Sequence, residues 1–262
     1  MMRMRIAFLC AALLTAGLVK VAASLPTQSQ TVSNPSQDEN IDPRQYPVAN
    51  YGASDASDPK ERNARRAKSA RHNSTGDINP KQLILTENSP PELFALPDSH
   101  VTAATAIPAA ESDIAVLGEI VQARAYLSED RTNIYSEFTV RVQEVLKNTS
   151  TGTLFPGASI TAERPGGALR FPSGKTLLRG SLGRNMPRVG RRYVLFLRHD
   201  DGESFNIITG YELREGRVFP LDHAAVGQGK SKQFANYERY SGADETMFLT
   251  EVREIFARSD KN

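Results

Sequence analysis

Two stretches of the chain decide its fold: Ile134–Leu146, IYSEFTVRVQEVL, and Gly190–Leu197, GRRYVLFL. In the first, apolar and polar residues alternate with a period of two, which is typical of a strand with one buried face. The second is an apolar run after a glycine and two arginines, which predicts a central strand buried on both faces. With Asp113–Ala125 (DIAVLGEIVQARA) ahead of them, these stretches predict strands of one small β-barrel.

The alternation also predicts which side chains face the interior. We expect four side chains of the first stretch to point inward: Ile134, Phe138, Val140 and Val142. We expect the residues between them to face solvent: Tyr135, Glu137, Thr139, Arg141 and Gln143. In Asp113–Ala125 the apolar positions change phase near Gly118, which indicates a β-bulge that bends the strand around a closed barrel. Further strands are predicted at Ala158–Glu163, Phe205–Ile208, Tyr211–Leu213 and Arg217–Leu221.

The C-terminal part, residues 223–262, is expected to be a linker followed by an amphipathic helix. Ser241, followed by Asp244 and Glu245, is typical of a helix start, with acids where the helix dipole favours them. Five apolar residues then follow at helical spacing: Phe248, Leu249, Val252, Ile255 and Phe256. We expect this amphipathic helix to pack on the barrel or to plug one end, with a partner-binding helix as the alternative.

The first residues indicate export. Two arginines lie within Met1–Arg5, an apolar run covers Ile6–Val19, and small residues precede Ser24. This pattern predicts a secretory signal peptide, residues 1–23, and a periplasmic or secreted bacterial protein. A retained anchor is the alternative. The only cysteine, Cys10, lies in that segment, so the mature chain is held without disulfides.

Residues 24–111 are rich in Ser, Asn, Asp, Pro, Gln and Ala, which predicts a long disordered arm. Within it Lys60–Arg71 (KERNARRAKSAR) holds six basic residues and one acid. We interpret this run as a solvated linker, or as a transient helix that touches anionic polymer or lipid headgroups. Apolar patches in Lys81–Phe94 are expected to add a strand to the folded domain or to bind a partner. The barrel itself is expected to cover residues 112–222.

The order of motifs is also familiar. It runs VLGEIV at 116–121, FTVRVQEVLKN at 138–148, SIT at 159–161, PRVGRRYVLFL at 187–197 and GY at 210–211. This order resembles the bacterial domains related to the netrin and tissue-inhibitor-of-metalloprotease family, an OB-like β-barrel. The VLKN at 145–148 matches the family's VLKG-type turn, with Asn in place of Gly. Gly190, Tyr193 and Leu197 match its G-x-x-Y-x-x-x-L strand.

The resemblance implies a mainly β fold, a small OB-like or netrin-like β-barrel with a C-terminal helix. In the animal inhibitors of this family, a disulfide-bonded N-terminal cysteine chelates the zinc of the protease. This chain has no such cysteine, so that mechanism does not carry over and no functional residue is transferred. A protease-inhibitor-like role remains an alternative on the resemblance alone.

The most unusual composition lies between the third and fourth predicted strands. Arg164–Arg192 contains eight basic residues, six glycines and no acid. Glycines allow backbone N–H groups to converge on an anion, and arginines supply two-pronged donors for phosphate or carboxylate. We interpret it as a loop that recognises an anionic cell-envelope polymer or an acidic protein surface, and a solvated insertion is the alternative. The candidate ligand-binding residues are Arg164, Arg170, Lys175, Arg179, Arg184 and Arg188.

No catalytic pattern stands out. The histidines of the mature chain are His72, His100, His199 and His223, and none is paired at a metal-ligand spacing. A metal-dependent or acid–base hydrolase built on His199 and His223 is the least favoured hypothesis. The formal net charge of +2 gives no global argument for a nucleic-acid partner. We therefore expect a non-enzymatic binding protein without a cofactor.

Overall fold

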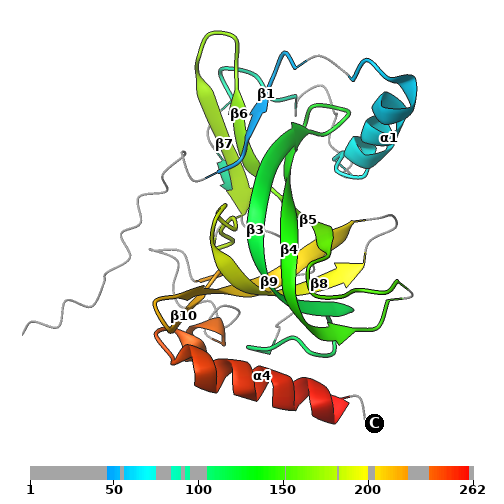
Figure 1. Cartoon of the computed structure of the whole chain (residues 1–262). Helices are drawn as coiled ribbons and strands as arrows, with labels where there is room; N and C mark the ends of the chain where they lie inside the picture. The colour runs from blue at the N-terminus through cyan, green and yellow to red at the C-terminus, as the bar shows by residue number, and fades with distance from the viewer. Residues whose placement is uncertain are drawn as a thin grey trace, which may run out of the picture. The chain divides into compact units, whose positions relative to one another are not determined.

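The computed structural model describes residues 46–53, 56–74, 84–89, 92–94, 105–150, 152–181, 183–199, 204–223 and 236–259. The predicted signal peptide, residues 1–23, lies outside the described residues. Within them the chain is mainly β, as the sequence predicts, and it ends in a helix (Figure 1).

The larger sheet has six strands. They are β3 (Ile114–Leu127), β4 (Ile134–Asn148), β5 (Ser159–Pro165), β8 (Arg192–His199), β9 (Phe205–Arg214) and β10 (Arg217–Pro220). Their order is β10-β9-β5-β4-β3-β8, and β8 also pairs with β9. The pairing of β5 with β9 is parallel, while the other pairings are antiparallel.

The predicted irregularity in the first long strand is present. The register between β3 and β4 shifts between Ala115 and Val116, between Leu117 and Gly118, and between Ile120 and Gln122. Gly118 lies where the two strands approach closely, because a Cβ there would lie 2.7 Å from Cγ1 of Val140. The glycine therefore permits the close approach of β3 to β4 at the bulge.

The interior-facing residues of this sheet form an apolar core. Its buried members are Ile114, Val116, Ile120, Phe138, Val140, Val142, Ala162, Met186, Tyr193, Leu195, Leu197, Ile207 and Leu221. Three of the four side chains predicted to point inward from β4 are in it, whereas Ile134 packs in a separate cluster. Strand β8 pairs on both sides and is buried on both faces, as predicted for a central strand.

The C-terminal helix α4 (Glu245–Ser259) packs on the sheet rather than standing free. Phe248, Leu249, Val252 and Phe256 are buried against Phe196, Tyr211 and other residues of β3, β8 and β9. The helix begins after Asp244, whose Oδ1 accepts hydrogen bonds from the backbone N–H of Thr246 (2.9 Å) and Met247 (3.1 Å). A short 3-10 helix, η3 (Tyr237–Tyr240), adds Tyr237 and Tyr240 to this cluster.

A second sheet is built from segments of the predicted arm and of the predicted basic loop. Its order is β1 (Val48–Asn50), β6 (Gly167–Arg170), β7 (Thr176–Ser181) and β2 (Glu92–Phe94). The segment Arg164–Arg192 is thus largely a hairpin of β6 and β7, not a loop. The strands form because Leu169, Phe171 and Leu177 are buried together with Ala49 and Leu85.

The predicted arm also contains a helix, α1 (Pro59–Ala70). The expectation of disorder over residues 24–111 therefore differs from the structure at β1 and α1, whereas β2 agrees with the added strand expected within Lys81–Phe94. These segments are short, and each depends on contacts with the folded domain: β1 and β2 extend a sheet, and α1 is held by side-chain charges. The amino-acid composition of a segment does not predict its contacts with residues far along the chain. Among the described residues, no helix has the length and apolar character to cross a bilayer.

Candidate functional site

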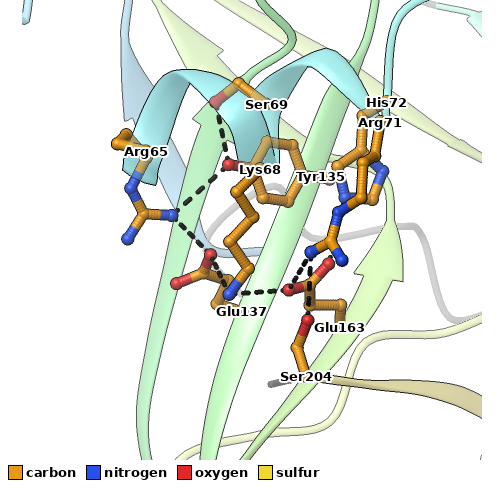
Figure 2. A network of polar contacts seen from close by, with 9 residues as sticks. All are labelled: Arg65, Lys68, Ser69, Arg71, His72, Tyr135, Glu137, Glu163 and Ser204. Carbon is orange, nitrogen blue, oxygen red and sulfur yellow. Dashed lines mark hydrogen bonds and ion pairs between the residues drawn. The ribbon is translucent and has the colours of Figure 1, made fainter. Parts of the chain in front are cut away.

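Two clusters of charged side chains lie in the described part of the chain, and the first fixes α1. Asp58 caps this helix, because its carboxylate accepts hydrogen bonds from the backbone N–H of Lys60 and Glu61, both at 3.3 Å. The helix side that faces β4 and β5 carries Arg65, Lys68 and Ser69, with His72 in the turn that follows (Figure 2). α1 therefore docks through polar and charged groups rather than through an apolar stripe.

Glu163, on β5, is the most buried carboxylate of this cluster, with 1% of its side chain exposed. Its Oε1 lies 2.7 Å from Nζ of Lys68, and its Oε2 lies 3.1 Å from Nε2 of His72. Arg71 reaches Glu163 at 3.5 Å and donates to Oγ of Ser204 at 3.1 Å. Burial alone would raise the pKa of Glu163, but hydrogen bonds from His72 and Lys68 outweigh it and lower this pKa to about 2.

Glu137, on β4, is the second acid of the cluster. It pairs with Arg65, and its Oε1 lies 2.8 Å from Nζ of Lys68. Burial would lower the pKa of Lys68, yet the hydrogen bonds to Glu137 and Glu163 raise it. Lys68 and Glu163 thus remain charged at neutral pH, so they act as an ion pair rather than as a general acid and base.

Tyr135 provides the aromatic part of the same contact. Its ring stacks on the His72 ring with centroids 3.9 Å apart, and its hydroxyl lies 3.0 Å from Oγ of Ser69. The guanidinium of Arg65 donates to this hydroxyl at 3.3 Å and lies over the Tyr126 ring. The prediction that Tyr135 faces solvent is therefore wrong, because α1 covers that face and leaves Tyr135 fully buried.

The same cluster corrects the prediction that Lys60–Arg71 is a solvated linker. This run is a helix whose Arg65, Lys68 and Arg71 are paired with acids of this chain, rather than a solvated linker. A polar turn holds the end of the helix segment. Asp130 accepts a hydrogen bond from the backbone N–H of Ser74 at 3.0 Å, and Asn133 Nδ2 donates to the His72 carbonyl at 3.0 Å.

The second cluster contains two of the six predicted ligand-binding residues. Arg164 is the penultimate residue of β5 and has 1% of its side chain exposed. Its Nη2 donates to both oxygens of Asp222, at 2.7 and 2.6 Å. Its Nη1 donates to the carbonyl of Asn185. Arg184 lies beside this pair: it forms an antiparallel bridge with Asp222 and donates to the carbonyl of Ile208 at 3.3 Å.

The other four predicted residues lie apart from this cluster. Arg170 ends β6 and Lys175 lies in the β6–β7 turn, and both are exposed. Arg179, on β7, is buried and donates to the carbonyl of Thr132 at 3.3 Å. Arg188 is half-buried, and its backbone N–H donates to the hydroxyl of Tyr193. The predicted set is therefore divided between the second cluster, the hairpin tip and structural positions.

The two histidines of the hydrolase hypothesis have other neighbours. His199 ends β8, where its ring meets the edge of the Phe205 ring at 5.4 Å. His223 follows β10, and its Nε2 lies 2.7 Å from Nδ2 of Asn185. Within the described ranges, no group of three or more His, Cys, Asp or Glu side chains is arranged to hold a metal ion.

No protein-family model matches the chain, and no curated protein matches it significantly.

Proposed function

We propose that this chain is a non-enzymatic binding protein that recognises an anionic ligand through the basic segment Arg164–Arg192. The observation that carries the proposal is a surplus of positive charge on an ordered scaffold. The segment has eight basic residues and no acid, and the β6–β7 hairpin presents Arg170 and Lys175 to solvent. Planar guanidinium groups and ammonium groups held on a fixed hairpin favour phosphate, sulfate and carboxylate groups.

Neighbouring groups support an anion-binding surface near the hairpin. The backbone N–H of Tyr51 donates to the carbonyl of Arg170 at 2.9 Å, so β1 fixes the end of β6. The exposed Arg131 places its guanidinium 5.0 Å from the centre of the Tyr51 ring, which itself packs on Phe171. Arg131 thus provides a third cation, from a different turn, near the same edge of the second sheet.

We also propose that the larger sheet is an OB-like barrel and that the protein is exported. The barrel is supported by the pairing series β3–β4–β5–β9–β8–β3, in which each strand has two neighbours, and by the parallel pair β5–β9. OB barrels commonly bind oligosaccharides or oligonucleotides. Export is supported by the N-terminal pattern of residues 1–23. We favour an anionic envelope polymer as the ligand over an acidic protein surface.

The experiment is chromatography of the full chain on heparin, used as a model polyanion, with a salt gradient. The double variant Arg170→Gln/Lys175→Gln should elute at clearly lower salt than the wild type, because two exposed cations are lost. Arg239→Gln/Arg258→Gln, which removes two exposed cations outside the segment, is the charge-matched control and should leave retention nearly unchanged. Wild-type protein that does not bind, or a double variant that elutes with the wild type, contradicts the proposal.

A further inference from the structure

The charges around Asp222 do not balance. Asp222 is a buried carboxylate, with 2% of its side chain exposed, and both of its oxygens accept from Arg164. Arg184 lies next to it through the Arg184–Asp222 backbone bridge, and no carboxylate pairs with Arg184 among the residues that the structure describes. Two guanidinium groups therefore share one carboxylate whose oxygens are already taken.

Some guanidinium N–H groups of Arg164 and Arg184 also lack an acceptor among the described residues. Nε of Arg164 is buried and donates to no acceptor within the described ranges. Among the described residues, the Arg184 side chain donates only to the Ile208 carbonyl, at a long 3.3 Å. A buried N–H of a charged group without an acceptor costs free energy, so such groups normally meet a partner. Burial, followed by the repulsion of Arg164, lowers the pKa of Arg184, which agrees with a cation short of negative charge.

The cluster under α1 offers a contrast within the same molecule. There Arg65, Lys68 and Arg71 each reach a carboxylate, Glu137 or Glu163. Arg184 is half-buried like them, yet its acceptor is a neutral main-chain oxygen. The Arg164–Arg184–Asp222 cluster thus differs from the α1 cluster, because Arg184 has no carboxylate partner among the described residues.

We propose that Arg184, backed by Arg164, binds one anionic group of the ligand, a carboxylate or a phosphate. This inference rests on the proposed function, because it names the group of the ligand that is recognised and the residue that recognises it. The bound oxygens complete the charge balance and accept from the free N–H groups of Arg184. Arg164, fixed by Asp222 and by the Asn185 carbonyl, is a positioning residue that supplies positive charge from behind.

The test uses the full chain with inorganic phosphate and, separately, acetate, in a chloride buffer. Calorimetric titration gives the dissociation constant, and thermal unfolding gives Tm with and without the anion. One or both anions should bind with a stoichiometry of one and raise Tm of the wild type. Arg184→Gln should weaken this binding at least about tenfold, as expected for loss of a charged hydrogen-bond donor. Arg258→Gln, which changes an exposed arginine of α4 outside the proposed binding surface, is the matched control and should bind as the wild type does.

A second readout separates a ligand-binding arginine from a structural one. Without phosphate, Arg184→Gln should have a Tm equal to or above that of the wild type, because an uncompensated buried charge is removed. A large fall in Tm would show that Arg184 serves the fold and would overturn the inference. Wild type that binds neither anion, or Arg184→Gln that binds both as tightly as wild type, would also overturn it. Binding by phosphate alone or acetate alone identifies the group and supports the site.

The heparin experiment distinguishes this failure from failure of the proposed function. Retention that depends on Arg170 and Lys175 but not on Arg184 leaves the function standing and removes the Arg184 site. Anion binding at Arg184 without heparin retention keeps the site and rejects the polymer as ligand.

Discussion

The Nζ atom of Lys68 lies 2.7 Å from Oε1 of Glu163, across the contact between α1 and β5. Both Lys68 and His72 lie far from Glu163 in the sequence: His72 precedes it by 91 positions, and Lys68 by more than ninety. This ion pair and its neighbours attach a helix from the N-terminal part to the sheet without a buried apolar residue of the helix. The attachment is therefore sensitive to single charges.

The first prediction concerns removal of one of these charges. Glu163→Gln keeps the size of the side chain but leaves Lys68 and Arg71 beside a neutral group. Because breaking a buried ion pair strands the remaining charges, the free energy of unfolding should fall by about 3–5 kcal/mol. Chemical denaturation measures it, and hydrogen exchange of residues 59–70 should accelerate because α1 loses its anchor.

Glu144→Gln is the control for this prediction. Glu144, on β4, forms a two-pronged pair with Arg253 of α4, at 2.7 and 2.8 Å, but both side chains are well exposed. Such surface pairs contribute about 0–1 kcal/mol. Equal losses in the two variants, or unchanged exchange in α1 of Glu163→Gln, would show that the Glu163 cluster does not hold the helix.

The second prediction concerns pH. The pKa of Glu163 is lowered from 4.5 to about 2, so the folded state binds its proton less readily than the unfolded state does. The stabilisation is complete above about pH 4.5 and is lost as the pH falls toward 2, for a total of about 3 kcal/mol. The difference in unfolding free energy between the wild type and Glu163→Gln should shrink over this interval. A difference in unfolding free energy that stays constant from pH 6 to pH 2 would contradict the lowered pKa of Glu163.

The third prediction concerns the contact of α4 with the sheet. Phe248 is buried against Tyr211 and Tyr240, with ring centroids 4.9 Å from each. Phe248→Ala should lower the free energy of unfolding by about 3–5 kcal/mol, because a buried aromatic side chain is lost and a cavity remains. Its neighbour Met247, 74% exposed, gives the control Met247→Ala, which should change stability by less than about 0.5 kcal/mol. A mild effect of Phe248→Ala would mean that α4 is not part of the core.

The fourth prediction concerns the bulge. In Gly118→Ala the new Cβ would lie 2.7 Å from Val140 Cγ1 and 2.9 Å from the Arg141 carbonyl oxygen. Since the oxygen belongs to the backbone of β4, the strands must separate, at a cost of about 1–3 kcal/mol. Gly52→Ala, where nothing lies within 4 Å, should be neutral or slightly stabilising. Thermal unfolding compares the two, and equal Tm values would argue against close approach at Gly118.

Much of the larger sheet was predictable, because its signals are local. Alternation in β4, the phase change near Gly118 and the apolar run of β8 each follow from burial of neighbouring residues. The Glu215–Gly216 turn is also local: both residues have positive φ, 54° and 72°, as a tight hairpin requires. The helix α4 has an apolar side at helical spacing and was predicted for the same reason.

The contacts of α1 and the second sheet were not predictable in this way. The inner side of α1 carries Arg65, Lys68 and Ser69, so hydrophobic periodicity gives no sign that it is covered. The acids that pair with this side of α1, Glu137 and Glu163, lie far from it in the sequence. For the hairpin of β6 and β7 a signal was present: Leu169 and Phe171 alternate with polar or small residues, and Gly174 marks the turn. The high glycine content of Arg164–Arg192 favoured a loop prediction over this alternation.

The same reasoning explains the division of the candidate ligand-binding residues. Composition identifies Arg164–Arg192 as basic, but it does not tell which cations are neutralised by acids from elsewhere. Asp222, which pairs with Arg164, lies 58 positions further along the chain. Only the folded arrangement separates Arg164, which is paired, from Arg184, which lacks a carboxylate among the described residues.

The most direct test of the central claim is to map the binding surface by NMR in solution. Amide and arginine side-chain resonances of the full chain would be followed while a heparin oligosaccharide is added. The account predicts saturable shifts at Arg170, Lys175 and Arg184, and at Nε–H of Arg164. Shifts confined to residues outside Arg164–Arg192, or no saturable shift at all, would contradict it.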